Sequence, residues 1–61
     1  MQKYKVLTPK EAFNDSNADW SYEINGTKSK RGYISKKGAY NAMIREVLKR
    51  MDKGEEFDNN N

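Results

Sequence analysis

The 61-residue chain contains no cysteine and no histidine. Without cysteine there is no disulfide and no thiolate metal site, and without histidine the commonest general base and metal ligand is missing. No stretch approaches the roughly 18 apolar residues of a membrane span, and no signal-peptide pattern opens the chain. We therefore expect a cytoplasmic, non-membrane protein that is not an enzyme and uses no cofactor and no metal.

Glycine and proline are also sparse, with four glycines and one proline in the whole chain. The glycines are scattered at predicted turns and element ends, so the sequence has no glycine-rich phosphate-binding loop. A chain of this length buries only about 60% of the surface that its unfolded state exposes. The sequence therefore predicts one small domain whose stability rests on packing alone.

Charge is distributed unevenly along the chain. Residues 28–53 carry nine lysines and arginines against two acidic residues, a net charge of +7. Residues 1–27 carry three basic and four acidic residues, and residues 54–61 carry three acidic residues and no basic one, so the whole chain reaches only +3. The modest total hides a basic second half followed by an acidic tail.

The amino-terminal residues predict a strand followed by a short helix. Residues 2–8, QKYKVLT, alternate loosely between polar and apolar side chains, as a strand does. Thr8 is a candidate helix cap, with Pro9 at the first helical position and Glu11 completing a capping box. The turn-forming residues that follow limit this helix to one or two turns, and Phe13 is expected to anchor it to the core.

A β-hairpin is predicted around Asn25-Gly26, the strongest two-residue turn signal, because a type I′ turn needs positive φ at both positions. The preceding strand alternates polar residues with three apolar ones, Trp20, Tyr22 and Ile24. The turn pairs three sets of residues: Ile24 with Thr27, Glu23 with Lys28, and Ser21 with Lys30. Beyond them two alternatives stay open, a one-residue bulge at Gly32 or a looser basic loop.

The carboxy-terminal half predicts an amphipathic helix that begins after the candidate cap Ser35. Six apolar residues recur at the spacing of one helical stripe: Tyr40, Met43, Ile44, Val47, Leu48 and Met51. Glu46 and Arg50 are spaced as a favourable i,i+4 ion pair, and Gly54 suits the position after the helix. The sequence therefore predicts an α+β domain over residues 1–53, with an antiparallel sheet of two or three strands packed on this helix. Residues 54–61 are expected to form a flexible acidic tail.

Basic residues gather on the return strand, the following loop and the start of the helix. The candidate nucleic-acid-binding residues are Lys28, Lys30, Arg31, Lys36 and Lys37, with Arg45 and Lys49 as further candidate contacts. A two-stranded ribbon fits the major groove of duplex DNA, where lysine and arginine neutralise phosphates and reach base edges. Tyr22 and Tyr33, interleaved with these charges, also suit stacking on single-stranded bases. The competing interpretation of the cluster is a solvated face that keeps the protein soluble.

The order of these motifs resembles the amino-terminal, arm-type DNA-binding domain of phage-like tyrosine integrases. The strand WSYEI, the basic strand TKSKRGYISKK and the helix GAYNAMIREVLKRM carry the resemblance, which covers about residues 19–51. It implies a three-stranded antiparallel sheet that packs on the helix and enters the major groove. It also implies groove or phosphate contacts from Lys28, Lys30 and Arg31, phosphate contacts from Lys36 and Lys37, and packing by Trp20, Tyr22, Ile24 and Ala39.

The chain departs from that family in two respects. Residues 1–18 and the acidic tail have no counterpart in the family pattern, and no catalytic domain follows the helix. The resemblance therefore implies a free-standing accessory module of a phage or mobile element, acting in the host cytoplasm if it is phage-encoded.

Three hypotheses about the partner follow from these observations. The leading one is duplex DNA, bound without catalysis by the basic hairpin and the start of the helix. The alternative is an acidic host protein, which a small phage-type inhibitor or adaptor would block through the same basic face, because charge complementarity speeds specific association. The third is a homodimer formed through apolar surface left on the helix.

Overall fold

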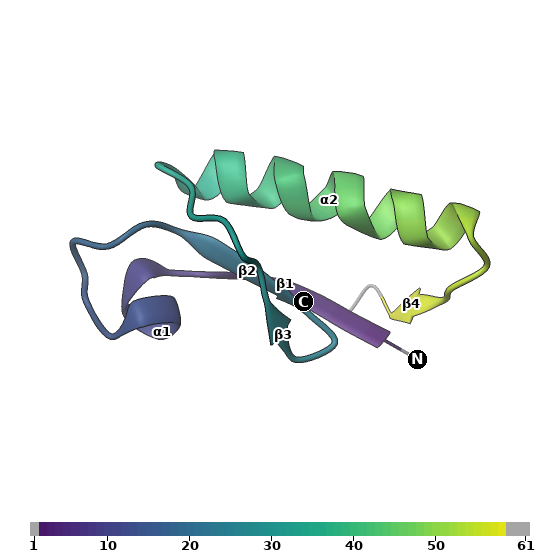
Figure 1. Cartoon of the computed structure of the whole chain (residues 1–61), viewed down its shortest axis with the longest axis horizontal. Helices are drawn as coiled ribbons and strands as arrows, with labels where there is room; N and C mark the ends of the chain where they lie inside the picture. The colour runs from purple at the N-terminus through teal and green to yellow at the C-terminus, as the bar shows by residue number, and fades with distance from the viewer. Residues whose placement is uncertain (1, 59–61) are drawn as a thin grey trace.

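The computed structural model describes residues 2–58. In chain order it contains β1 (Gln2–Leu7), α1 (Pro9–Phe13), β2 (Ser21–Ile24), β3 (Thr27–Lys28), α2 (Lys36–Asp52) and β4 (Phe57–Asp58) (Figure 1). The strands form one sheet in the order β3-β2-β1-β4, in which β1, β2 and β3 are antiparallel and β4 runs parallel to β1. The predicted α+β class, an antiparallel sheet packed on a carboxy-terminal helix, is confirmed.

The two helices lie on opposite faces of the sheet (Figure 1). Cross-strand partners share a face, so the pairing of Tyr4 with Ile24 places both side chains against α2, where Ile24 joins the core. The pairing of Leu7 with Ser21 places both residues on the other face, which α1 approaches, and both are buried. Small as it is, the domain therefore buries residues on both faces of the sheet.

The core is narrow because α2 packs mainly against the two central strands β1 and β2. Its buried cluster consists of Ile24, Met43, Val47 and Phe57. The helix also buries Ala39, but only part of the predicted six-residue stripe belongs to the core: Tyr40, Leu48 and Met51 are 50%, 57% and 43% exposed. The sheet is thus too narrow to cover the whole apolar stripe of α2, and part of the stripe stays exposed.

The short helix α1 begins as the sequence predicts. The Thr8 hydroxyl accepts a hydrogen bond from the Glu11 amide at 3.1 Å, and the Glu11 carboxylate accepts one from the Thr8 amide at 2.9 Å. These bonds form the predicted capping box, with Pro9 in the first turn. Phe13, however, does not anchor the helix to the core, since it is 45% exposed at the end of the helix.

The hairpin turn is confirmed and the strand after it is shorter than predicted. Asn25 and Gly26 have φ values of 54° and 84°, and Glu23 pairs with Lys28 as expected. The strand ends there, and pairing resumes only at an isolated bridge between Trp20 and Tyr33. The register has shifted by two residues instead of one, so the predicted pairing of Ser21 with Lys30 is wrong and residues 29–32 form a basic loop.

Gly32 allows this loop to return to the sheet. A Cβ atom at Gly32 would lie 2.6 Å from Asp19 Oδ2 and 2.7 Å from Asp19 Cβ, closer than such atoms approach. Glycine is therefore required by the close passage of Asp19 and not by a one-residue bulge.

The end of α2 reverses the chain and extends the domain beyond residue 53. Gly54, at φ 97°, donates its amide to the Met51 carbonyl, and the Glu55 amide bonds the Arg50 carbonyl, the pair of bonds that defines a Schellman motif. The chain then runs back as β4, and Phe57 is only 8% exposed. Residues 54–58 thus differ from the predicted flexible tail, because Phe57 has apolar surface to bury; residues 59–61 lie outside the described residues.

Within residues 2–58, no helix is both long and apolar enough to cross a membrane.

Candidate nucleic-acid interface

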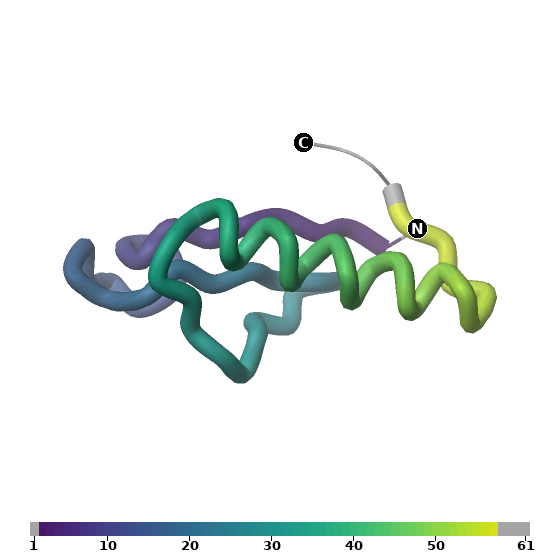
Figure 2. Tube along the Cα trace, turned by 90° about the horizontal axis from the view of Figure 1, so that it is seen from above, coloured from purple at the N-terminus to yellow at the C-terminus, as the bar shows by residue number. Residues whose placement is uncertain are grey.

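An open groove lies between the basic loop, residues 29–32, and one flank of α2. Seen from above, the loop projects to one side of α2 while β1 lies on the other side (Figure 2). The groove consists of two adjoining hollows of about 300 and 570 Å³. The two hollows share four lining residues: Tyr22, Arg31, Tyr33 and Glu46.

Two tyrosines form the floor of the groove. The rings of Tyr22 and Tyr33 have centroids 6.0 Å apart and are tilted by 32°. Tyr33 is held by a backbone pair with Trp20, whose N–H and C=O bond Tyr33 at 2.7 and 2.8 Å. Burial raises the pKa of the Tyr22 hydroxyl above its ordinary value of 10.0, with smaller contributions from nearby Tyr33 and Glu46. Tyr22 is therefore uncharged at neutral pH, and the floor is aromatic.

Cations from two separate elements line the groove above this floor. Arg31 comes from the loop and lies with its guanidinium carbon 5.7 Å from the Tyr33 ring centroid. Arg45 and Lys49 come from α2, one helical turn apart on the flank that faces the loop. Among residues 2–58 none of these three side chains forms an ion pair. Their charges are thus available to an anionic ligand.

The loop that carries Arg31 is fastened by two serines. The Ser21 and Ser29 hydroxyls form a hydrogen bond at 2.7 Å, and Ser29 Oγ donates to the Arg31 carbonyl at 2.8 Å. Ser21 is fully buried, with 0% exposure. The sequence predicted Lys30 as the strand partner of Ser21 and did not predict the bond between the two serines, because nothing in a strand sequence indicates which side-chain partner lies eight positions away.

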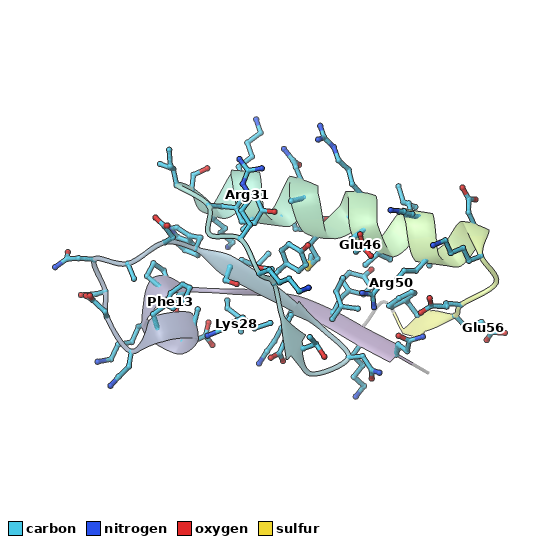
Figure 3. All side chains as sticks on the ribbon, in the orientation of Figure 1. Phe13, Lys28, Arg31, Glu46, Arg50 and Glu56 are labelled. Carbon is cyan, nitrogen blue, oxygen red and sulfur yellow. The ribbon has the colours of Figure 1, made fainter. Side chains whose placement is uncertain are left out.

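Glu46 and Arg50 neutralise each other at the inner wall of the groove. Arg50 Nε donates to Glu46 Oε2 at 2.9 Å, which confirms the predicted i,i+4 pair, and both side chains extend from α2 toward the sheet (Figure 3). The pair adds no net charge. The positive potential of the groove therefore comes from the basic loop and from Arg45 and Lys49 of α2.

Lys28, although predicted as a nucleic-acid contact, has its charge on the other face of the sheet. Its ammonium donates to the Ala12 carbonyl at 2.8 Å and lies 4.5 Å from the Phe13 ring centroid (Figure 3). Glu23, its strand neighbour, pairs instead with Lys5 at 3.8 Å. Lys28 thus connects β3 to the end of α1. The alternation of residues along the strand does not predict this contact.

The remaining predicted residues divide into two groups. Lys30 lines the same hollow as Arg31, whereas Lys36 and Lys37 lie exposed in the first turn of α2 and line neither hollow. Ile34, which precedes them, is 96% exposed. The structure therefore brings Lys30, Arg31, Arg45 and Lys49 to one groove. Lys28 also lines the smaller hollow, but its ammonium is directed to α1, and Lys36 and Lys37 lie outside the groove.

Residues 2–58 contain no group of three or more acidic side chains placed to hold a metal ion. Comparison of the chain with known protein families, curated proteins and solved structures found no match. The resemblance to integrase arm domains therefore stays a prediction from the sequence.

Proposed function

We propose that this chain is a non-enzymatic nucleic-acid-binding module whose partner is duplex DNA. The observation that carries the proposal is the convergence of Arg31, Arg45 and Lys49 on one groove without ion-pair partners in residues 2–58. Phosphate contacts by such cations release counterions, which supplies most of the affinity of sequence-independent DNA binding.

The geometry of the tyrosines favours a duplex over a single strand. Stacking on single-stranded bases needs an accessible ring face. The Tyr33 ring instead contacts the Tyr22 ring, and the Arg31 guanidinium lies over it. We therefore assign the tyrosines to positioning the cations, and the affinity to contacts between the cations and the phosphates.

The test is fluorescence anisotropy with random-sequence duplex DNA, titrated from about 50 to 200 mM salt. The site variant reverses three groove charges, Arg31→Glu, Arg45→Glu and Lys49→Glu. The control variant makes the same change in net charge at exposed positions away from the groove, Lys3→Glu, Lys10→Glu and Lys53→Glu. Circular dichroism checks that both variants are folded.

We expect the native protein to bind with an affinity that falls steeply with salt. Loss of three phosphate contacts should make the slope of log K against log salt shallower by about 2.7 in the site variant, whereas the control keeps most of the slope. Equal losses in the two variants would mean that only net charge matters and that the groove is not the site. A native protein that binds no DNA at the lowest salt would rule out the proposal.

A second candidate function is that of a small inhibitor or adaptor that blocks an acidic host protein. The observation that favours it is Ile34, 96% exposed beside Lys36 and Lys37. Protein interfaces commonly place an apolar anchor inside a polar rim. An Ile34→Ser variant should lose such a protein partner in a pull-down while its DNA affinity stays unchanged; the opposite pattern would exclude this function.

A further inference from the structure

The flank of α2 that faces away from the groove carries exposed apolar side chains. We call Tyr40, Ile44, Leu48 and Met51 the outer strip. A helix turns about 100° per residue, so spacings of four, four and three keep these residues on one flank over about 17 Å. Tyr40, Leu48 and Met51 are 50%, 57% and 43% exposed, and Ile44 is partly buried against the core.

This strip is unusual on so polar a chain, in which 34% of residues are charged. Single exposed apolar residues are common on protein surfaces, but a contiguous group marks a contact with another molecule. The strip lies on the flank opposite Arg45 and Lys49, so its occupant would leave the groove open. Covering the strip would also enlarge a core that is small for a stable domain.

The charges at the two ends of the strip identify the occupant. Lys37 lies one turn before Tyr40, and Asp52 directly follows Met51. If a second α2 packs antiparallel with its centre near the midpoint of Ile44 and Leu48, each Lys37 lies near the Asp52 of the other copy. A parallel pair would place the two Lys37 side chains together, where like charges repel. The strip is therefore complementary to itself in one orientation.

We propose that two copies of this chain form a homodimer in which their α2 helices pack antiparallel through the outer strip. A two-fold axis relates the copies, so Ile44 of each copy contacts Leu48 of the other, and Tyr40 of each copy lies near Met51 of the other. Antiparallel packing also places the positive end of each helix dipole near the negative end of the other. Four partly exposed side chains make a small interface, below the roughly 1,200 Å² of stable complexes, so we expect a micromolar dissociation constant.

The first test is sedimentation equilibrium of the full chain over a wide range of protein concentrations. The native protein should pass from monomer to dimer as the concentration rises, and Leu48→Glu should stay monomeric. The matched control is Phe13→Glu, which adds the same charge to another exposed apolar residue, on α1, and should still dimerise. A native protein that remains monomeric at the highest concentration would overturn the proposal, as would dimerisation of the Leu48→Glu variant.

The second test exchanges the charges and does not depend on removing an apolar side chain. Lys37→Glu alone and Asp52→Lys alone should each raise the dissociation constant about tenfold, because each places like charges together. The double variant should recover the native value. Lys10→Glu, the same change as Lys37→Glu at an exposed position on α1, should leave the dissociation constant unchanged. Failure of the double variant to recover would exclude the antiparallel pairing.

Discussion

Replacing Phe57 with alanine should remove most of the stability of this protein. Phe57 is 8% exposed and belongs to the same buried cluster as Ile24, Met43 and Val47. Its ring also meets Tyr4 edge-on, with centroids 6.0 Å apart and an interplanar angle of 70°. The substitution therefore removes both buried apolar surface and an aromatic contact.

The magnitude follows from the size of the side chain and of the domain. Phe→Ala in a core costs about 3–5 kcal/mol in the free energy of unfolding. Small domains have only about 0.05–0.15 kcal/mol of stability per residue, which amounts to about 3–9 kcal/mol for this chain. At the middle of both ranges a Phe57→Ala variant keeps only about 2 kcal/mol of stability, and a chain truncated after residue 53 should be destabilised at least as much.

The assay is urea unfolding followed by circular dichroism, with the free energy extrapolated to water. The control is Glu56→Ala at the exposed neighbouring position, which should change the free energy by less than about 0.5 kcal/mol. A Phe57→Ala variant that loses less than about 1 kcal/mol would show that residues 54–58 are not part of the core.

Three further predictions concern single residues. Gly32→Ala should cost about 1–3 kcal/mol of unfolding free energy, because the added Cβ meets Asp19 at 2.6 Å; adding Asp19→Gly should restore most of it, and no recovery would refute the steric explanation. Lys28→Met should lower the free energy of unfolding by about 0.5–1.5 kcal/mol through loss of the contact with Phe13 and of a hydrogen bond, and an unchanged urea midpoint would contradict this. Burial raises the pKa of Tyr22 above 10.0, so the unfolded chain releases this proton first and stability should fall as pH rises from 10 through the native pKa. Urea midpoints measured across that range should show the fall in the native protein, and a fall of the same size in Tyr22→Phe would assign it to other groups.

The elements that local chemistry governs were predictable from the sequence. Asn25-Gly26 formed the expected turn because few other pairs tolerate positive φ at both positions. Thr8 and Ser35 cap their helices because each hydroxyl accepts a bond from an amide three residues ahead. Such interactions span only a few residues, so the residues themselves identify them.

The candidate site was predictable only in part. Composition and spacing identified the basic second half, and Arg31, Arg45 and Lys49 do meet at one groove. Lys28 was grouped with them because it lies on the hairpin strand that leads into the loop of Arg31, yet its ammonium donates to the Ala12 carbonyl of α1 on the other face. Which face receives a long lysine side chain depends on what packs beside it, and α1 is sixteen residues away in the sequence.

The sequence by itself determined the turn, the caps, the main helix and the concentration of positive charge, since each depends on neighbours within one turn of chain. Only the tertiary structure decided that Phe57 completes the core, that the register shifts by two residues before Tyr33, and that half of the apolar stripe of α2 stays exposed. Those outcomes depend on how wide the sheet is and where the chain returns to it. Both the width of the sheet and the position of the return depend on pairing between residues far apart in the chain, which no local sequence pattern predicts.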